Sequence, residues 1–173
     1  MFVYAETIKM LTISRMSPAT TSVDIFACLG RYLSRRYAGV ISAEDLPEWF
    51  SLVEVGMAMT RWRWSPESFF DTPNLIFLYM LLRSQTAPIT SKEELMTGVM
   101  ARLYVSHCCV GFETGYPLRP FVHNLQCSSE EFWSLCLEIT IASSGEMLRI
   151  NADPAFFVEL LTELTDWEGD ESP

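Results

Sequence analysis

The residue types that usually bind metals or carry out catalysis are sparse in this sequence. The run His107-Cys108-Cys109, followed downstream by His123 and Cys127, contains residue types that ligate zinc. Adjacent residues of a helix point about 100° apart, so this run does not direct its three side chains at one ion. We therefore expect no metal and no cofactor. Neither histidine has a carboxylate nearby in the sequence to orient it as a general base.

The adjacent carboxylates Glu130 and Glu131 could be read as an acid–base pair, but their position indicates another role. Ser128 and Glu131 have the spacing of a capping box, and acidic side chains at a helix start interact favourably with the helix dipole. The sequence contains no P-loop, no GxGxxG after a strand, no HExxH and no GxSxG motif. These observations predict a binding protein and not an enzyme.

Composition and charge narrow the class further. A hydrophobic content of 49% with 13% aromatic residues predicts one well-packed globular domain. The net charge of −10 disfavours a nucleic-acid surface, which needs clustered lysine and arginine. Five cysteines without CxxC spacing indicate reduced thiols, so we expect a cytoplasmic or nuclear protein. No apolar run reaches the ~18 residues of a membrane span, and we expect no membrane anchor in this chain.

The segment from Ser91 to Phe121 is predicted to organise the chain. Ser91 and Glu94 form a capping-box pattern, and apolar residues then follow two neighbouring stripes of a helix from Lys92 to Val110. A helix apolar over that much of its circumference is expected to be buried among other helices. The glycines and proline of residues 111–117 end it in an exposed loop.

The remaining segments predict an all-α fold of six or seven helices. We expect a helix capped by Thr21 and ending near Tyr37, and further helices at residues 45–62, 72–82, 129–141 and 154–164, with a break from Ser143 to Gly145. Trp133 and Leu137, one turn apart, are expected to pack inward against the central helix. The domain prediction is an arm at residues 1–20, one domain at 21–166 and an acidic tail at 167–173.

Several short stretches resemble the cyclin-dependent kinase 5 activator family. They occur in the family's order and spacing from about Ser22 to Leu164, which makes the resemblance specific. The stretches are Cys28-Leu29-Gly30, Pro73-Asn74-Leu75-Ile76-Phe77-Leu78-Tyr79-Met80-Leu81, Tyr116-Pro117-Leu118-Arg119-Pro120-Phe121, Phe132-Trp133 with Cys136-Leu137, and Ile150-Asn151-Ala152-Asp153-Pro154.

The resemblance implies a single cyclin-box domain with a central hub helix. It also implies a non-catalytic regulatory subunit that forms a heterodimer with a Cdk5-like Ser/Thr kinase and activates it by positioning its C-helix and activation loop. The alternative is a cyclin-fold scaffold that binds a kinase or another protein without activating it. We expect the membrane tethering that the lipidated N-terminal region gives animal members not to carry over to this chain.

The resemblance also assigns kinase-binding residues. It places activation-loop contacts at Gly111 and Ile150 and a contact surface at Val110, Glu113 and Thr114. Glu113 matches a family carboxylate that faces the kinase's substrate groove and favours a basic residue downstream of the phosphorylated position.

Two of the implied contact positions depart from the family pattern. The family carries Asp and Asn where this chain has Ser134 and Ile141. A helical separation of seven places these two residues on the same face, two turns apart. The departures predict altered kinase preference.

Overall fold

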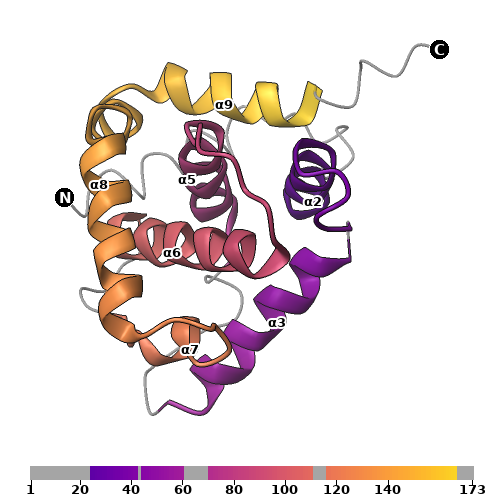
Figure 1. The fold of residues 1–173 in the computed structure, drawn as a ribbon. Coiled ribbons are helices and arrows are strands. Elements are labelled where there is room, and N and C mark those ends of the chain that lie inside the picture. Colours follow the sequence, from indigo (N-terminus) through magenta and orange to yellow (C-terminus); the bar gives the residue numbers. More distant parts are fainter. Residues whose placement is uncertain (1–23, 43, 61–69, 111–115, 167–173) are drawn as a thin grey trace.

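The computed structural model describes residues 24–42, 44–60, 70–110 and 116–166, and these residues form seven α-helices and no strand. This confirms the predicted all-α single domain. Figure 1 shows one helix, α6, at the centre, with the others arranged around it. The helices are α2 (Ile25–Arg36), α3 (Asp45–Ala58), α5 (Thr72–Arg83), α6 (Lys92–Val110), α7 (Arg119–Val122), α8 (Ser129–Ala152) and α9 (Pro154–Asp166).

Helix α6 is the predicted hub. Leu95 and every residue from Gly98 to His107 are buried, and α5 and α8 pack most extensively against it. The Ser91 hydroxyl accepts a hydrogen bond from the backbone N–H of Glu94 at 3.1 Å, as expected. In a complete capping box, the Glu94 carboxylate would accept from the backbone N–H of Ser91. Here it accepts from the backbone N–H of the preceding residue, Thr90, also at 3.1 Å.

Helix α5 is also largely buried, from Asn74 through Leu82. Its apolar run could also suit a strand, but two features start a helix here. Asp71 accepts a hydrogen bond from the backbone N–H of Asn74 at 3.1 Å, and Pro73 lies in the first turn, where its missing N–H costs nothing. The buried Ser106 hydroxyl of α6 donates to the Asn74 carbonyl at 2.9 Å and joins the two helices.

Three predicted boundaries are corrected. Helix α2 begins after Asp24, whose carboxylate accepts from the backbone N–H of Ala27 at 3.1 Å, whereas the expected cap, Thr21, lies outside the described residues. Helix α3 ends at Ala58, before the expected end at Trp62, which is also outside them. Helix α8 runs unbroken for 24 residues through the expected break at Ser143–Gly145. One glycine in a helix costs only about 1 kcal/mol, which the packing of a long helix exceeds.

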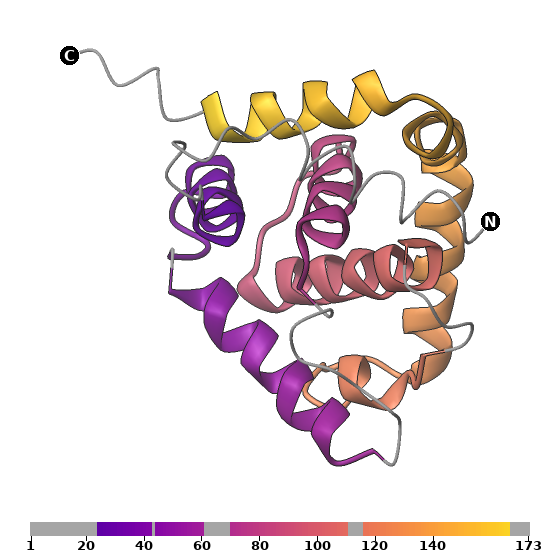
Figure 2. The same cartoon turned by 180° about the vertical axis from the view of Figure 1, so that it is seen from behind.

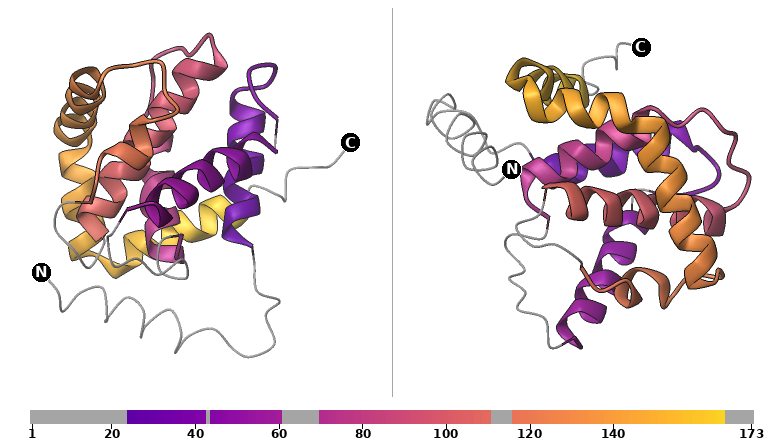
Figure 3. Two further views of the ribbon diagram at one scale, coloured as in Figure 1. Left: turned by 90° about the horizontal axis from the view of Figure 1, so that it is seen from below. Right: turned by 90° about the vertical axis from the view of Figure 1, so that its left-hand side faces the viewer.

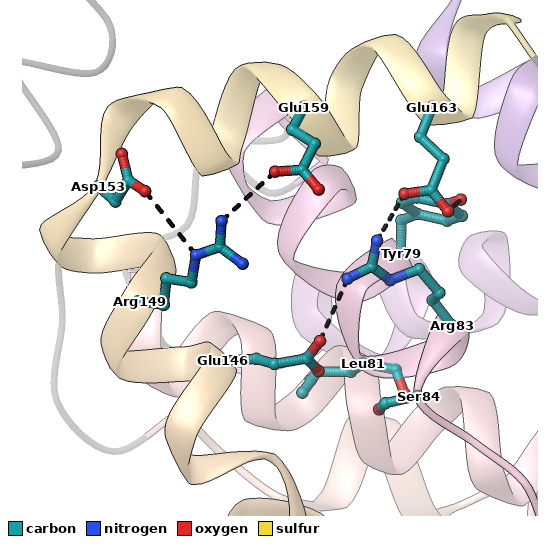
Figure 4. Close-up of polar contacts among 9 residues, drawn as sticks. All are labelled: Tyr79, Leu81, Arg83, Ser84, Glu146, Arg149, Asp153, Glu159 and Glu163. Atoms are coloured by element: carbon teal, nitrogen blue, oxygen red, sulfur yellow. Dashed lines mark hydrogen bonds and ion pairs between the residues drawn. The ribbon is translucent and has the colours of Figure 1, made fainter.

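Helix α9 lies across α2 and α5, an arrangement visible from front and back (Figures 1 and 2). Asp153 separates it from α8 and caps it as predicted, because its carboxylate accepts from the backbone N–H of Ala155 at 3.0 Å. Two arginines fasten α9 to the helices beneath it (Figure 4). Arg83 of α5 contacts Glu163 at 2.5 Å and Glu146 at 3.2 Å, and Arg149 of α8 contacts Glu159 at 3.4 Å.

Candidate functional site

Helix α8 forms one outer side of the molecule, where the right-hand view of Figure 3 faces it directly. Its start is fixed by the capping box that the sequence predicts. The backbone N–H of Glu131 donates to the Ser128 hydroxyl at 3.2 Å, and the backbone N–H of Ser128 donates to the Glu131 carboxylate at 2.8 Å. This second bond lowers the pKa of Glu131. Glu131 therefore serves the helix start, as the sequence indicates.

The inner face of α8 is held by Phe132, Cys136, Ile139, Ser143 and Ile150, all of them buried. The thiol of Cys136 donates to the carbonyl oxygen of Ala101 on α6 at 3.8 Å and so contacts the hub directly.

The outer face carries large apolar side chains, which we call the apolar row: Trp133, Leu137, Ile141 and Leu148. Their exposed fractions are 49%, 48%, 75% and 73%. Spacings of four residues keep Trp133, Leu137 and Ile141 within about 80° of the helix circumference. Leu148 lies two turns farther along, in the part of α8 that runs in a different direction (Figure 3, right). Single exposed apolar residues are common on monomers, whereas several large ones on one helix are typical of an interaction surface.

The expectation that Trp133 and Leu137 pack into the core is therefore wrong. Both residues are half-exposed because the neighbouring Phe132 and Cys136 occupy the inner face. Trp133 does reach the hub, since its ring centroid lies 6.2 Å from that of Tyr104 on α6. It is an edge residue of the core and also the first member of the apolar row.

Tyr104 connects the apolar row to the segment that follows α6. Its hydroxyl donates to the carbonyl oxygen of Tyr116 at 3.1 Å, and its ring packs edge-on against Phe121 with centroids 5.1 Å apart. Burial raises the pKa of Tyr104 well above its ordinary value, so the hydroxyl stays protonated and remains a donor. Trp133, Tyr116 and Phe121 thus contact the same side chain.

The structure places four of the seven predicted kinase-binding residues. Ser134 and Ile141 are both exposed on α8, and Val110 is half-buried at the end of α6. Ile150 is only 3% exposed and belongs to the core near the α8–α9 junction. Gly111, Glu113 and Thr114 lie outside the described residues.

Leu137 and Leu148 were not predicted as surface residues, although their spacing from Ile141 contained the signal. The sequence of α8 is apolar on several sides, so periodicity alone offers two candidate inner faces. The choice between them depends on contacts with α6, which come from distant parts of the chain.

The histidines and cysteines were the sequence's candidates for a metal site. Within the described ranges, no group of three or more His, Cys, Asp or Glu side chains is placed to hold a metal ion. His107 is 1% exposed, and burial lowers its pKa to about 3, so its imidazole is neutral. Burial also raises the pKa of the Cys109 thiol to about 11. None of the described helices has the length and apolar character needed to cross a membrane.

Comparison with known proteins identifies the family. A model of the family described as "Cyclin-dependent kinase 5 activator protein" matches residues 8–169. Cyclin-dependent kinase 5 activator 1 of Spermophilus citellus is 34% identical over 156 residues, which cover 88% of this chain and 49% of that protein. Human cyclin-dependent kinase 5 activator 2 is 32% identical over 145 residues, which cover 82% of this chain and 38% of that protein.

A more distant animal gives a similar result. Cyclin-dependent kinase 5 activator 1 of Caenorhabditis elegans is 29% identical over 153 residues, or 86% of this chain and 42% of that protein. The chain thus spans less than half the length of these relatives. Because the family model covers nearly all of it, from residue 8 to residue 169, the chain belongs to the cyclin-dependent kinase 5 activator family.

Proposed function

We propose that this chain is a non-catalytic regulatory subunit that binds a Cdk5-like Ser/Thr kinase as a heterodimer and activates it. Membership of the family supports this function, and so do relatives whose names state that they activate cyclin-dependent kinase 5. The observation that carries the proposal is the apolar row of α8, a surface whose exposure is explained if a partner covers it.

The energetics of the row fit a protein partner. Ile141 and Leu148 are about three-quarters exposed, and fully burying such a side chain contributes ~1.5–3 kcal/mol. Side chains that contribute this much are needed because the loss of translational and rotational freedom on association costs several kcal/mol. Trp133 supplies the large aromatic anchor that interface centres favour, and it is already held in place by Tyr104.

Activation then follows from selective binding to one kinase conformation. A partner that contacts only the active arrangement of the C-helix and activation loop shifts the population toward it by the difference in contact energy. In this proposal, α8 provides the docking face, and Val110, Gly111, Glu113 and Thr114 provide a second contact at the end of α6. Glu113 favours substrates with a basic residue downstream of the phosphorylated site.

Ile150 has an indirect role in the same proposal. Its side chain is buried, so it supports the backbone at the α8–α9 junction, and contact with the activation loop is made by the surface it holds in place. Asp153, which caps α9 within the same turn, contributes to the same rigidity.

The test compares a charge placed on the row with the same charge placed elsewhere. Ile141→Asp adds a carboxylate to the row at a 75% exposed position, and Val158→Asp adds one to α9 at a 52% exposed position. Both variants should fold normally. With the purified Cdk5-like kinase from this protein's own source, we expect Ile141→Asp to weaken binding and peptide phosphorylation at least about tenfold, because the new charge must be desolvated, and Val158→Asp to have no effect.

Binding without stimulation of the kinase would refute activation and identify the chain as a scaffold. Equal behaviour of the two variants would show that the apolar row is not the docking face.

A further inference from the structure

A cavity of about 360 Å³ lies on the side of α8 away from the apolar row. Its walls come from the connection between α5 and α6, the first half of α6, and the middle of α8. Cavities that bind small molecules in proteins typically measure ~300–1,000 Å³, so this one has room for a small ligand.

The most unusual group in the wall is a buried arginine. Arg102 of α6 is 9% exposed, and its guanidinium donates from Nε to the Leu81 carbonyl and from Nη1 to the Gly98 carbonyl, both at 3.0 Å. No carboxylate of the described residues pairs with it. A guanidinium has five N–H donors, so Arg102 retains donors that these two carbonyl groups do not use. Its burial also lowers its pKa, which reflects the cost of an uncompensated buried charge.

Gly98 makes room for this guanidinium. A Cβ atom at Gly98 would lie 3.3 Å from Arg102 Nη1, closer than most Cβ contacts. Because Gly98 has no side chain, the guanidinium of Arg102 can lie against the preceding turn of α6, where it donates to the Gly98 carbonyl.

A second helix contributes a further buried polar group. Ser143 of α8 is 6% exposed and lines the cavity, and its hydroxyl makes no hydrogen bond with the described residues. Gln85, also in the wall, has a buried Oε1 atom without a partner among them. The Gln85 oxygen needs a donor, whereas the unused donors of Arg102 and the Ser143 hydroxyl line the same cavity and can donate to a bound acceptor.

The rest of the wall limits what that molecule can be. Ile89, Leu135 and Ile139 offer apolar surface, whereas Glu94 and Glu138 place two acidic side chains around the same cavity. The carboxylates disfavour a ligand that carries two or more negative charges. A ligand with an apolar chain and a single negative charge next to Arg102 suits both the apolar wall and the two carboxylates.

We propose that this cavity binds a small amphipathic monocarboxylate, whose carboxylate accepts hydrogen bonds from the unused donors of Arg102 and from the Ser143 hydroxyl while its apolar body lies against Ile89, Leu135 and Ile139. The binding is separate from kinase activation.

The test titrates octanoate into the free protein by calorimetry, with 1-octanol as the uncharged analogue and inorganic phosphate as a compact anion. Saturable one-to-one binding of octanoate is expected, about tenfold or more tighter than 1-octanol, because hydrogen bonds between charged groups are worth that much when buried. Phosphate should not bind. Equal affinity for octanoate and 1-octanol, tight phosphate binding, or no octanoate binding would each overturn the proposal.

Variants then locate the binding. Arg102→Met should abolish the preference for octanoate over 1-octanol. Since Arg102 also joins α6 to α5, a second variant approaches from α8: Ala142→Phe, at an exposed lining position, should fill the cavity and reduce octanoate affinity at least about tenfold. Ala155→Phe, at an exposed position of α9 outside the lining, is the matched control and should bind normally. Unchanged octanoate binding by Ala142→Phe would place the ligand elsewhere and refute the site.

Discussion

The Glu163 carboxylate of α9 accepts a hydrogen bond from the buried Tyr79 hydroxyl of α5 at 2.9 Å and, through its other oxygen, contacts Arg83 at 2.5 Å (Figure 4). One side chain therefore satisfies a phenol that has no access to water and anchors an arginine that also reaches α8 through Glu146. This shared carboxylate joins three helices behind the proposed kinase-binding face.

The first prediction compares two glutamates of α9. Glu163→Ala should lower the free energy of unfolding by about 1–3 kcal/mol, because it leaves the buried Tyr79 hydroxyl without its acceptor. Glu159→Ala removes an exposed pair with Arg149, which should matter by less than about 1 kcal/mol. Urea unfolding of both variants measures the difference, and equal losses would mean that the Tyr79 contact adds nothing.

A second prediction concerns alkaline pH. Burial first, and then Glu163, raise the pKa of Tyr79 above its ordinary value of 10.0. The unfolded chain releases this proton near pH 10 and the folded chain retains it, so the stability contributed by the protonated hydroxyl is complete below pH 10 and decreases as pH rises above it.

Tyr79→Phe should therefore reduce the loss of stability between about pH 9 and pH 11. Some loss will remain, because burial also raises the pKa values of Tyr32 and Tyr104. Urea unfolding midpoints across this range test the prediction, and an unchanged pH dependence in Tyr79→Phe would contradict it.

The third prediction uses two adjacent residues of α8 that differ in exposure. Phe132 is fully buried, so Phe132→Ala should cost ~3–5 kcal/mol. Trp133 is 49% exposed, so Trp133→Ala should cost less than half as much. The loss of kinase affinity, measured on the folded fraction of each variant, should be larger for Trp133→Ala than for Phe132→Ala, because only Trp133 belongs to the apolar row. A loss of stability in Trp133→Ala equal to that in Phe132→Ala would show that the tryptophan is a core residue after all.

This contrast shows what the sequence could predict. Caps depend on neighbours within three residues, so Ser128 with Glu131 and Asp153 with Ala155 could be located from local pattern alone. The hub was also predictable, since a helix apolar on all sides has to be buried. The orientation of α8 was not, because it depends on whether Phe132 or Trp133 faces α6, and those helices are far apart in the chain.

The candidate site was less predictable than the fold for the same reason. The predicted positions Ser134 and Ile141 do lie exposed on one helix. Leu137 and Leu148 are exposed as well, but this could be predicted only by knowing which face of α8 packs against α6. Arg102 gave no sequence signal, since an arginine within an apolar helix normally extends to solvent.

The fourth prediction concerns Gly145, where the sequence indicated a helix break and the structure has none. A Cβ atom at this exposed position would meet no other atom within 4 Å. Gly145→Ala should therefore stabilise the protein by about 0.5–1 kcal/mol, because alanine loses less backbone freedom on folding. Gly39→Ala is the contrasting control: it has equal space, but its backbone φ of 84° strains any other side chain, so it should destabilise. Destabilisation by Gly145→Ala, measured in urea, would indicate that the helix does break there in solution.

The last prediction concerns kinase preference and rests on Ser134 and Ile141. Both are exposed on α8, seven residues apart, and Ile141 is a member of the apolar row. If the family's contact surface is retained, a kinase that offers a hydrogen-bond donor to each position finds a hydroxyl and an apolar side chain in place of a carboxylate and an amide. A buried donor left unpaired costs roughly 1–3 kcal/mol, or ~10–150-fold in affinity for each position.

We expect weak binding to a conventional animal Cdk5 and tighter binding to the kinase from this protein's own source. Ser134→Asp combined with Ile141→Asn should narrow or reverse that preference, whereas Ser134→Ala, which adds no acceptor, should not. Titration of both kinases against the wild type and the two variants decides the matter, and equal affinities throughout would place this strip outside the interface.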